Sequence, residues 1–204
     1  MSLNTAPLGA QTYQLLLGEI LAGKRLEGEK ISEESIAREF GISRTPAREA
    51  LLRLASDALI ERTARKGCRV KRIDREGLRD LFQCRAMLEA LALKLGFDRI
   101  PAGELGEVEA ALRKARSARD AAASLQADDR LHGAILAACP NRTLASAITR
   151  MQHQCDAFRA LRAASTDVEA LTDERLAIVR AISAGQKKAA ELLLSDHILQ
   201  GAPK

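Results

Sequence analysis

The sequence predicts a mainly α fold in two domains, residues 1–73 and residues 74–204. Only 2% of the 204 residues are aromatic and none is Trp. Ala and Leu recur at helical spacing, which favours helices packed through small side chains over sheets. A hydrophobic fraction of 47% can support a buried core. The chain length suits one small domain followed by a larger, all-helical one.

Two short helices joined by a glycine turn are predicted between residues 32 and 54. Ser32 is a good N-cap for the first helix, because its hydroxyl can accept a hydrogen bond from a first-turn amide. Gly41 suits the left-handed residue that ends this helix. Ser43 then caps a second helix, where Pro46 is tolerated because first-turn amides have no intrahelical acceptor. This pattern is typical of a helix-turn-helix.

The polar side of the second helix carries Arg44, Thr45 and Arg48. In a helix-turn-helix the N-terminal residues of the second helix reach base edges, and arginine can bind guanine or phosphate through two hydrogen bonds. We therefore expect this helix to bind double-stranded DNA. The alternative is an ordinary helical hairpin with a solvated basic face.

The sequence that follows favours DNA binding. Residues 59–60 and 68–73 are predicted as two short strands around a basic turn that ends at Gly67. Such a hairpin is a wing, and Lys66 at its tip would lie beside a phosphate backbone or a minor groove. Residues 1–73 hold 13 Lys and Arg against 9 Asp and Glu, so +4 of the net charge of +5 lies in the first domain, as phosphate binding requires.

The run from Tyr13 through Val70 closely resembles the winged helix-turn-helix of GntR-family transcriptional regulators. Its string SRTPAREAL is close to the most characteristic string of that family. The resemblance implies a transcription factor that binds an operator. By the same resemblance, the expected DNA contacts are Arg38, Ser43, Arg44, Thr45, Arg48, Lys66 and Gly67.

The second domain is predicted to consist of six helices. Pro101 and Pro140 separate neighbouring helices, and capping residues mark several of the ends. The expected ranges are 74–98, 102–122, 124–139, 141–163, 167–184 and 186–202.

Ionisable residues interrupt the apolar stripes of these helices. Arg85 falls on the inner face of the first helix and must find a partner, because burying an unpaired guanidinium is costly. Asp128 and His132 are four residues apart in the third helix and so lie on one side of it. Arg175 and His197 lie among apolar residues of the last two helices. Several titratable groups inside an apolar bundle indicate a small-molecule site.

Each of these residues also has a simpler interpretation. A lone inward histidine is more often a hydrogen-bonded core residue than a ligand. Asp128 with His132 could form only a helix-surface pair, and Arg85 could bridge to Glu89 one turn on. Arg175 could extend its guanidinium to solvent.

The second domain is similar to the all-helical FCD effector domain of the FadR subfamily of GntR regulators. The segments that carry this resemblance are CRAMLEALALKL, DDRLHGAILAACPN and ERLAIVRAISAGQKKAAELLLSDHI. Members of that group often hold zinc or another divalent metal, which binds an organic-acid effector together with a nearby arginine. The resemblance implies Asp128, His132 and His197 as metal ligands and Arg85 as the effector-binding arginine.

The sequence departs from this pattern at Arg175, which stands where the family usually has a fourth ligand, a histidine. A guanidinium stays protonated and cannot donate a lone pair to a metal. Two alternatives remain open. Three ligands could still hold zinc, or Arg175 could replace the ion, pair with Asp128, and turn with Arg85 toward an acidic effector.

Taken together, the sequence predicts a homodimeric DNA-binding transcriptional regulator, most often a repressor in this family. It would bind a near-palindromic operator under the control of a small organic acid. The rival hypotheses are a helical metal-dependent enzyme using Asp128, His132 and His197, and a nonspecific architectural DNA protein. A nucleophile beside a base and a phosphate loop are both missing from the sequence, which argues against an enzyme.

The remaining composition indicates a soluble cytoplasmic protein. The four cysteines, at positions 68, 84, 139 and 155, show no paired spacing and are expected to be buried thiols. The N-terminus has no leader pattern, and no apolar run is long enough to span a membrane.

Overall fold

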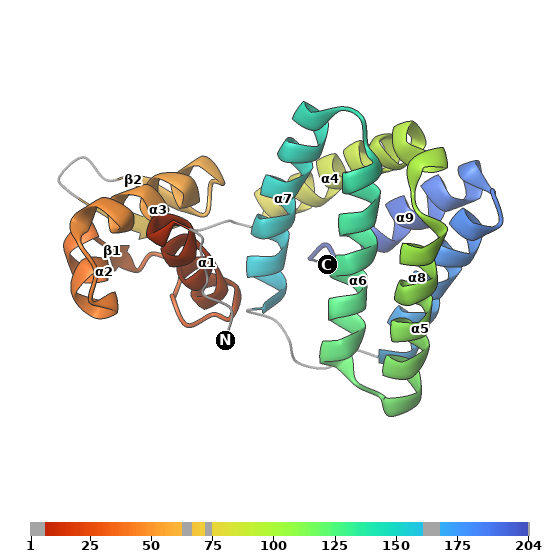
Figure 1. The fold of residues 1–204 in the computed structure, drawn as a ribbon, viewed down its shortest axis with the longest axis horizontal. Helices are drawn as coiled ribbons and strands as arrows, with labels where there is room; N and C mark the ends of the chain where they lie inside the picture. The colour runs from red at the N-terminus through yellow and green to blue at the C-terminus, as the bar shows by residue number, and fades with distance from the viewer. Residues whose placement is uncertain (1–6, 63–66, 72–74, 161–167, 204) are drawn as a thin grey trace. The chain divides into compact units, whose positions relative to one another are not determined.

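The computed structural model describes residues 7–62, 67–71, 75–160 and 168–203 of the chain. Its residue contacts divide it into two compact units. The first comprises Met1–Asp74 with Arg150–Ala163, and the second comprises Arg75–Thr149 with Ala164–Lys204. Figure 1 shows that helices dominate the described chain, as the sequence predicts.

The N-terminal part combines three helices with a small antiparallel sheet. Strand β3 lies between β1 and β2, with Cys68 opposite Ile31 and Val70 opposite Ile60. The elements are α1 (Leu8–Leu21), β1 (Lys30–Ile31), α2 (Glu33–Phe40), α3 (Arg44–Ser56), β2 (Ile60–Arg62) and β3 (Cys68–Val70).

The predicted turn between α2 and α3 is confirmed. The backbone amide of Ser35 donates to the Ser32 hydroxyl, and the backbone amide of Ser32 donates to the Ser35 hydroxyl, each at 3.0 Å. This reciprocal pair is a capping box, which satisfies two amides at the start of α2. Gly41 ends α2 with a φ of 64°, a left-handed conformation that glycine adopts without a steric penalty.

Ser43 differs from the prediction. It occupies the N-cap position of α3 with extended backbone, but its side chain makes no capping hydrogen bond. The predicted cap at Ser43 is therefore right in position and wrong in its hydrogen bond. The exposed Ser43 hydroxyl is not engaged in holding α3.

Helix α1 and strand β1 are absent from the sequence prediction. Helix α1 packs against α3, and its buried side chains Tyr13, Leu16 and Ile20 belong to the core of this part. Ile31 of β1 is buried in the same core. Helix α1 covers the apolar face of α3, and the polar face of α3 stays exposed.

The six helices predicted for the second domain all have counterparts, with ends that differ by a few residues. The predicted positions 161–163 and 167 lie outside the described residues. A short 3₁₀ helix, η1 (Phe97–Arg99), extends the first of the six. The helices are α4 (Arg75–Gly96), α5 (Ala102–Ala118), α6 (Ala121–Ala138), α7 (Arg142–Ala160), α8 (Val168–Ser183) and α9 (Lys187–Gln200).

Helices α4, α6, α8 and α9 surround the polar residues that the sequence singles out. Helix α4 packs against α9 and α6, while α8 packs against α5, α6 and α9. At the end of α4, a Cβ on Gly96 would approach the backbone carbonyl of Ala138 to 2.8 Å. Glycine therefore allows the close approach of α4 to the end of α6.

The prediction that all four cysteines are buried is confirmed for two of them. Cys139 and Cys155 are buried thiols, as predicted, but Cys84 is exposed and Cys68 is half-buried. Cys84 lies one residue before Arg85, on the outer side of α4, so the expectation of burial is wrong there.

Among the described residues, no helix combines the length and apolar character that crossing a membrane requires.

The two serines that begin α2 and α3 give a matched test of the capping difference. Ser32→Ala should lower the free energy of unfolding by about 1 kcal/mol, because α2 loses its side-chain cap. Ser43→Ala should change it by less than about 0.5 kcal/mol, because no cap is lost. Urea denaturation followed by circular dichroism measures both values, and equal losses would contradict the described caps.

Candidate functional site

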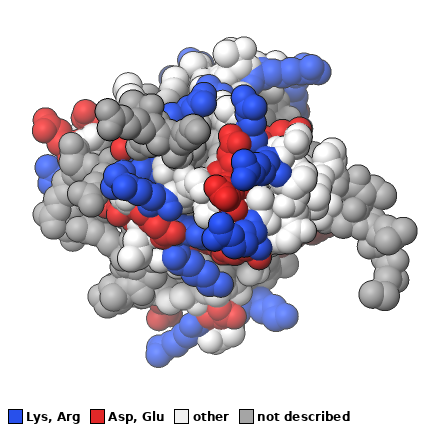
Figure 2. All heavy atoms as spheres, turned by 90° about the vertical axis from the view of Figure 1, so that its left-hand side faces the viewer, with Lys and Arg blue, Asp and Glu red and all other residues white. Residues whose placement is uncertain are grey.

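The exposed N-terminal turns of α3 present the polar residues that the sequence assigns to DNA. Ser43, Arg44, Thr45 and Arg48 are all exposed, while Ala47 is buried on the opposite side. The side chains of Arg44 and Arg48 are 71% and 66% exposed. Figure 2 shows Lys and Arg side chains spread over one face of the molecule and interleaved with acidic ones. Helix α3 therefore offers a basic edge to a partner.

Three arginines of this surface have acidic neighbours on α2. Glu34 lies 3.7 Å from Arg38 and 3.6 Å from Arg44, and Glu33 lies 3.8 Å from Arg48. Exposed ion pairs at these distances contribute little to stability because water screens them. The guanidinium groups can therefore exchange these carboxylates for phosphate or base acceptors at small cost.

The predicted wing is confirmed in its strands and lies partly outside the described residues. Strands β2 and β3 pair antiparallel as expected. Gly67 precedes β3 and has a φ of 149°, a positive value that favours glycine. Lys66 lies outside the described residues. Arg69 of β3 donates to the backbone oxygen of Gly28 at 2.9 Å, which holds this strand to the preceding loop.

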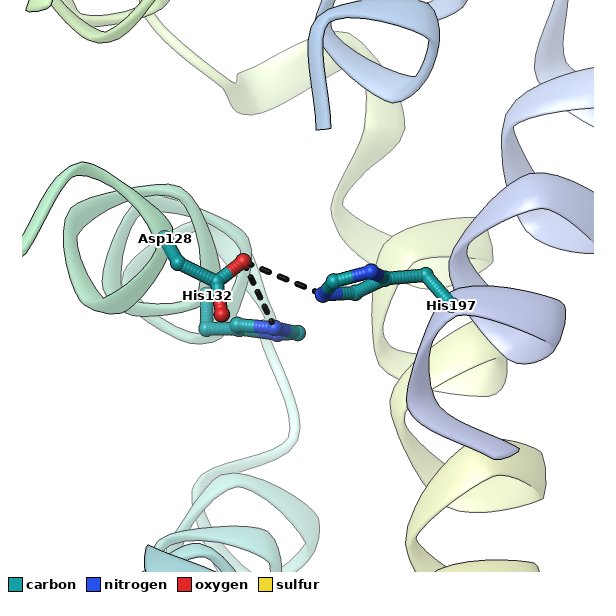
Figure 3. Close-up of side chains that lie close together, drawn as sticks. All are labelled: Asp128, His132 and His197. Carbon is teal, nitrogen blue, oxygen red and sulfur yellow. Dashed lines mark hydrogen bonds and ion pairs between the residues drawn. The ribbon is translucent and has the colours of Figure 1, made fainter. Parts of the chain in front are cut away.

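In the second unit, the Asp128 carboxylate is the centre of a buried polar cluster. Asp128 and His132 lie one turn apart on α6, and His197 reaches them from α9, as Figure 3 shows. His197 Nε2 lies 3.1 Å from Asp128 Oδ1, and His132 Nε2 lies 3.6 Å from the same oxygen. The two imidazole rings stack with centroids 5.8 Å apart. The structure thus brings together three residues that the sequence places on two helices.

Arg175 of α8 completes this cluster from another side. Its Nε lies 3.0 Å from Asp128 Oδ1, and its Nη2 donates to Asp128 Oδ2 at 3.3 Å. Its Nη1 donates to the Ser124 hydroxyl at 2.8 Å. Arg175 is only 5% exposed, so the interpretation that it extends to solvent is wrong.

Arg85 is buried on α4 and joins the cluster through Glu89. Its Nε donates to Glu89 Oε2 at 3.1 Å, and the other carboxylate oxygen of Glu89 binds Nδ1 of His132. Glu89 has no solvent exposure. The sequence leaves open whether Arg85 points inward or pairs with Glu89, and the structure shows both.

The two buried carboxylates are held in their charged form. Burial by itself raises the pKa of Asp128, but the neighbouring imidazoles and Arg175 outweigh it and hold that pKa well below its usual range. The pKa of Glu89 is likewise lowered, because His132 and Arg85 outweigh the effect of its burial. The cluster therefore contains two ionised carboxylates and two guanidinium groups.

The contacts around Asp128 decide whether these residues could bind a divalent metal ion. Asp128, His132 and His197 each offer one ligand atom within 4.8 Å of the others, and His132 Nε2 has no hydrogen-bond partner among the described residues. However, Arg175 engages both oxygens of Asp128 and has no lone pair to offer. As arranged, the residues do not fit a divalent cation.

Sequence reasoning missed three partners of this cluster. Ser124 and Thr172 are buried and 2.8 Å apart through their hydroxyl oxygens, and Glu174 Oε2 lies 3.3 Å from His197 Nδ1. Ser124 lies four residues before Asp128, so helical spacing alone could have placed it on the same face. The remaining histidine, His153, belongs to the first unit, where it contacts Tyr13 and Asp57.

Comparisons with known proteins agree with this architecture. Residues 8–70 match the gntR family of bacterial regulatory proteins, and residues 80–200 match the FCD domain. A curated relative from Paenarthrobacter nicotinovorans is named "Probable D-xylose utilization operon transcriptional repressor". It is 25% identical over 203 residues, which is 98% of this chain and 90% of the relative.

Solved structures show the same fold. E. coli McbR/YncC superposes with a TM-score of 0.80 at 19% identity, covering 96% of this chain and 95% of that one. The Zn²⁺-bound FCD domain of TM0439 gives a TM-score of 0.55 at 23% identity, covering 64% of this chain and 92% of that one. Its metal-free form gives 0.56 at 21% identity with the same coverage. The fold likeness therefore does not distinguish a metal-bound state from a metal-free one.

The two matched families occupy consecutive parts of the chain and together cover most of it. The exposed arginines of α3 lie in the first match, and the buried Asp128 cluster lies in the second. This chain therefore belongs to the GntR family and carries an FCD domain, which makes it a DNA-binding transcriptional regulator with a C-terminal effector-binding domain.

Proposed function

We propose that this regulator is a homodimeric repressor that binds a near-palindromic operator and responds to a small organic acid bound near Arg85 and Arg175. The observation that carries the proposal is the pairing of an exposed basic helix in one unit with two buried arginines in the other. The name of the curated relative supports repression. We place the domain boundary at residues 73 and 74, between the two family matches.

The proposed DNA contacts divide into two kinds. Arg44, Thr45 and Arg48 begin the recognition helix and bind base edges, because the N-terminal residues of such a helix enter the major groove. The remaining contacts position the protein on phosphates. They are Arg38, Ser43, and the wing residues Lys66 and Gly67.

Arginine substitutions test the DNA interface. Arg48→Ala should weaken specific operator binding by about 1 to 3 kcal/mol, because a charge-assisted contact is lost, and Arg44→Ala should act similarly. Arg113→Ala is the control, since Arg113 is an exposed arginine of α5 that pairs with Glu109. Fluorescence anisotropy with operator and random DNA measures the affinities. Wild-type operator affinity in both α3 variants would refute this assignment of α3.

The effector proposal rests on the two buried guanidinium groups. Arg85 and Arg175 are 1% and 5% exposed, and arginine binds carboxylates through two parallel hydrogen bonds. An effector shifts operator binding only by the difference between its affinities for the two states of the protein. A divalent ion held by Asp128, His132 and His197 is the alternative occupant, as in the Zn²⁺-bound relative.

Acid titrations test the effector proposal. Genomic footprinting locates the sites that the protein occupies, and the genes beside those sites guide the choice of a panel of small acids. At least one of these acids should change operator affinity by about 5-fold to 150-fold, a typical allosteric coupling. The effect should disappear in Arg85→Met, and circular dichroism checks that this variant, which loses a buried ion pair, is still folded. Turnover of an acid by the purified protein would instead support the enzyme alternative.

An exposed apolar stripe on α4 supports the dimer, and we propose that two copies meet there. Met87, Leu91 and Leu95 are 68%, 42% and 45% exposed and lie four residues apart on one side of the helix. Asp80 precedes Met87 by seven residues and Lys94 follows it by seven, and both are exposed. If two copies of α4 pair antiparallel around Met87, Asp80 of each copy lies opposite Lys94 of the other, which would favour the pairing.

A charged substitution in the stripe tests this contact. Leu91→Glu should convert the dimer into a monomer in light scattering and weaken operator binding, because a carboxylate would be buried between two apolar faces. Leu125→Glu is the matched control, since Leu125 of α6 is similarly exposed at 44%. A Leu91→Glu protein that remains dimeric would show that α4 does not form the contact.

A further inference from the structure

We infer that Arg175 is a built-in cation that takes the place of a metal ion in this FCD domain, so that the domain binds its acidic effector without a divalent metal. The inference deepens the proposed function and rests on it for the identity of the ligand as an acid. It is supported by the way Arg175 is held, by the charge balance around it, and by the buried polar atoms that remain unsatisfied.

All three nitrogens of the Arg175 guanidinium have contacts within the cluster. Asp128 binds one edge through two oxygens, and the Ser124 hydroxyl accepts from Nη1. The Thr172 hydroxyl donates to the backbone oxygen of Val168 at 2.6 Å, so the Ser124 hydroxyl is free to donate to Thr172 Oγ1. Two successive turns of α6 thus hold the guanidinium where it neutralises Asp128.

The buried carboxylates and the buried guanidinium groups of the cluster are equal in number. Asp128 and Glu89 are the fully buried carboxylates, and Arg85 and Arg175 are the buried guanidinium groups. A divalent cation at Asp128 would add two positive charges within a few ångströms of the permanently charged Arg175. Coulomb repulsion at that distance is large in a buried site, so the ion would bind only if Arg175 moved away.

Two buried atoms indicate how an acid could bind. Among the described residues, His132 Nε2 has no hydrogen-bond partner, and Arg175 Nε lies 3.0 Å from Asp128 Oδ1 as an ion pair that lacks hydrogen-bond geometry. A carboxylate oxygen of an acid could accept from this N–H in better geometry if it displaced Asp128 Oδ1. A carboxylate can only accept, so His132 Nδ1 is the donor in its contact with Glu89, and Nε2 is the ring nitrogen left for another partner. A polar group of the effector could contact Nε2 without a metal.

Metal analysis of the full-length protein tests the inference directly. Protein purified without chelator should contain zinc far below one ion per chain, and Arg175→His should bind one Zn²⁺ per chain at least about 10-fold more tightly than wild type, because the variant gains a fourth ligand and loses a fixed charge. Arg113→His, an exposed substitution on α5, is the control for an added histidine. Elemental analysis and zinc titration calorimetry provide the readouts.

The outcomes separate this inference from the proposed function. Stoichiometric zinc in the wild-type protein that is lost in His132→Ala would overturn it. A folded Arg175→His protein that binds zinc no more tightly than wild type would also overturn it, because Arg175 would not be what excludes the ion. An acid response of operator binding that survives EDTA supports the inference, and one abolished by EDTA overturns it. If no acid acts, the effector proposal fails while the zinc results still decide the role of Arg175.

Discussion

The buried carboxylate of Asp128 is the constraint on which the second unit depends. A charge with no solvent exposure is tolerated only if positive or hydrogen-bonding groups surround it. His132 on the same helix, Arg175 on α8 and His197 on α9 supply those groups. Glu89 extends the cluster to α4 through His132 and Arg85. One carboxylate therefore ties the relative placement of four helices to a single polar cluster.

Such a cluster is a poor source of net stability and a good source of specificity. Removing one partner of a buried ion pair typically costs about 3 to 5 kcal/mol, whereas replacing the whole pair with apolar residues is often neutral. An apolar core at this position could thus hold the same helices. Its retention as a charged cluster is easier to explain if the charges recognise a ligand, which agrees with an effector-binding domain.

The sequence predicts what depends on local chemistry. Ser32 and Gly41 mark the ends of α2 because a cap and a left-handed turn are determined by neighbouring residues. Helical spacing likewise places Asp128 and His132 on one face. Whether Ser43 uses its hydroxyl as a cap, and which residues touch Arg175, depends on how whole elements pack. Helix α1 contains no motif that would distinguish it, so its role in the core of the first unit appears only in the structure.

The two functional surfaces use ion pairs in opposite ways. On α3, Arg44 and Arg48 lie 3.6 and 3.8 Å from Glu34 and Glu33, and because these pairs are exposed, water and salt weaken them. Around Asp128, burial strengthens every pair and makes each exchange of partner costly. An acid that displaces Asp128 from Arg175 must replace most of the interaction it breaks. A bound ion can leave with its ligand, but a covalently attached guanidinium cannot, so the response of this domain would depend on the acid and not on the supply of metal.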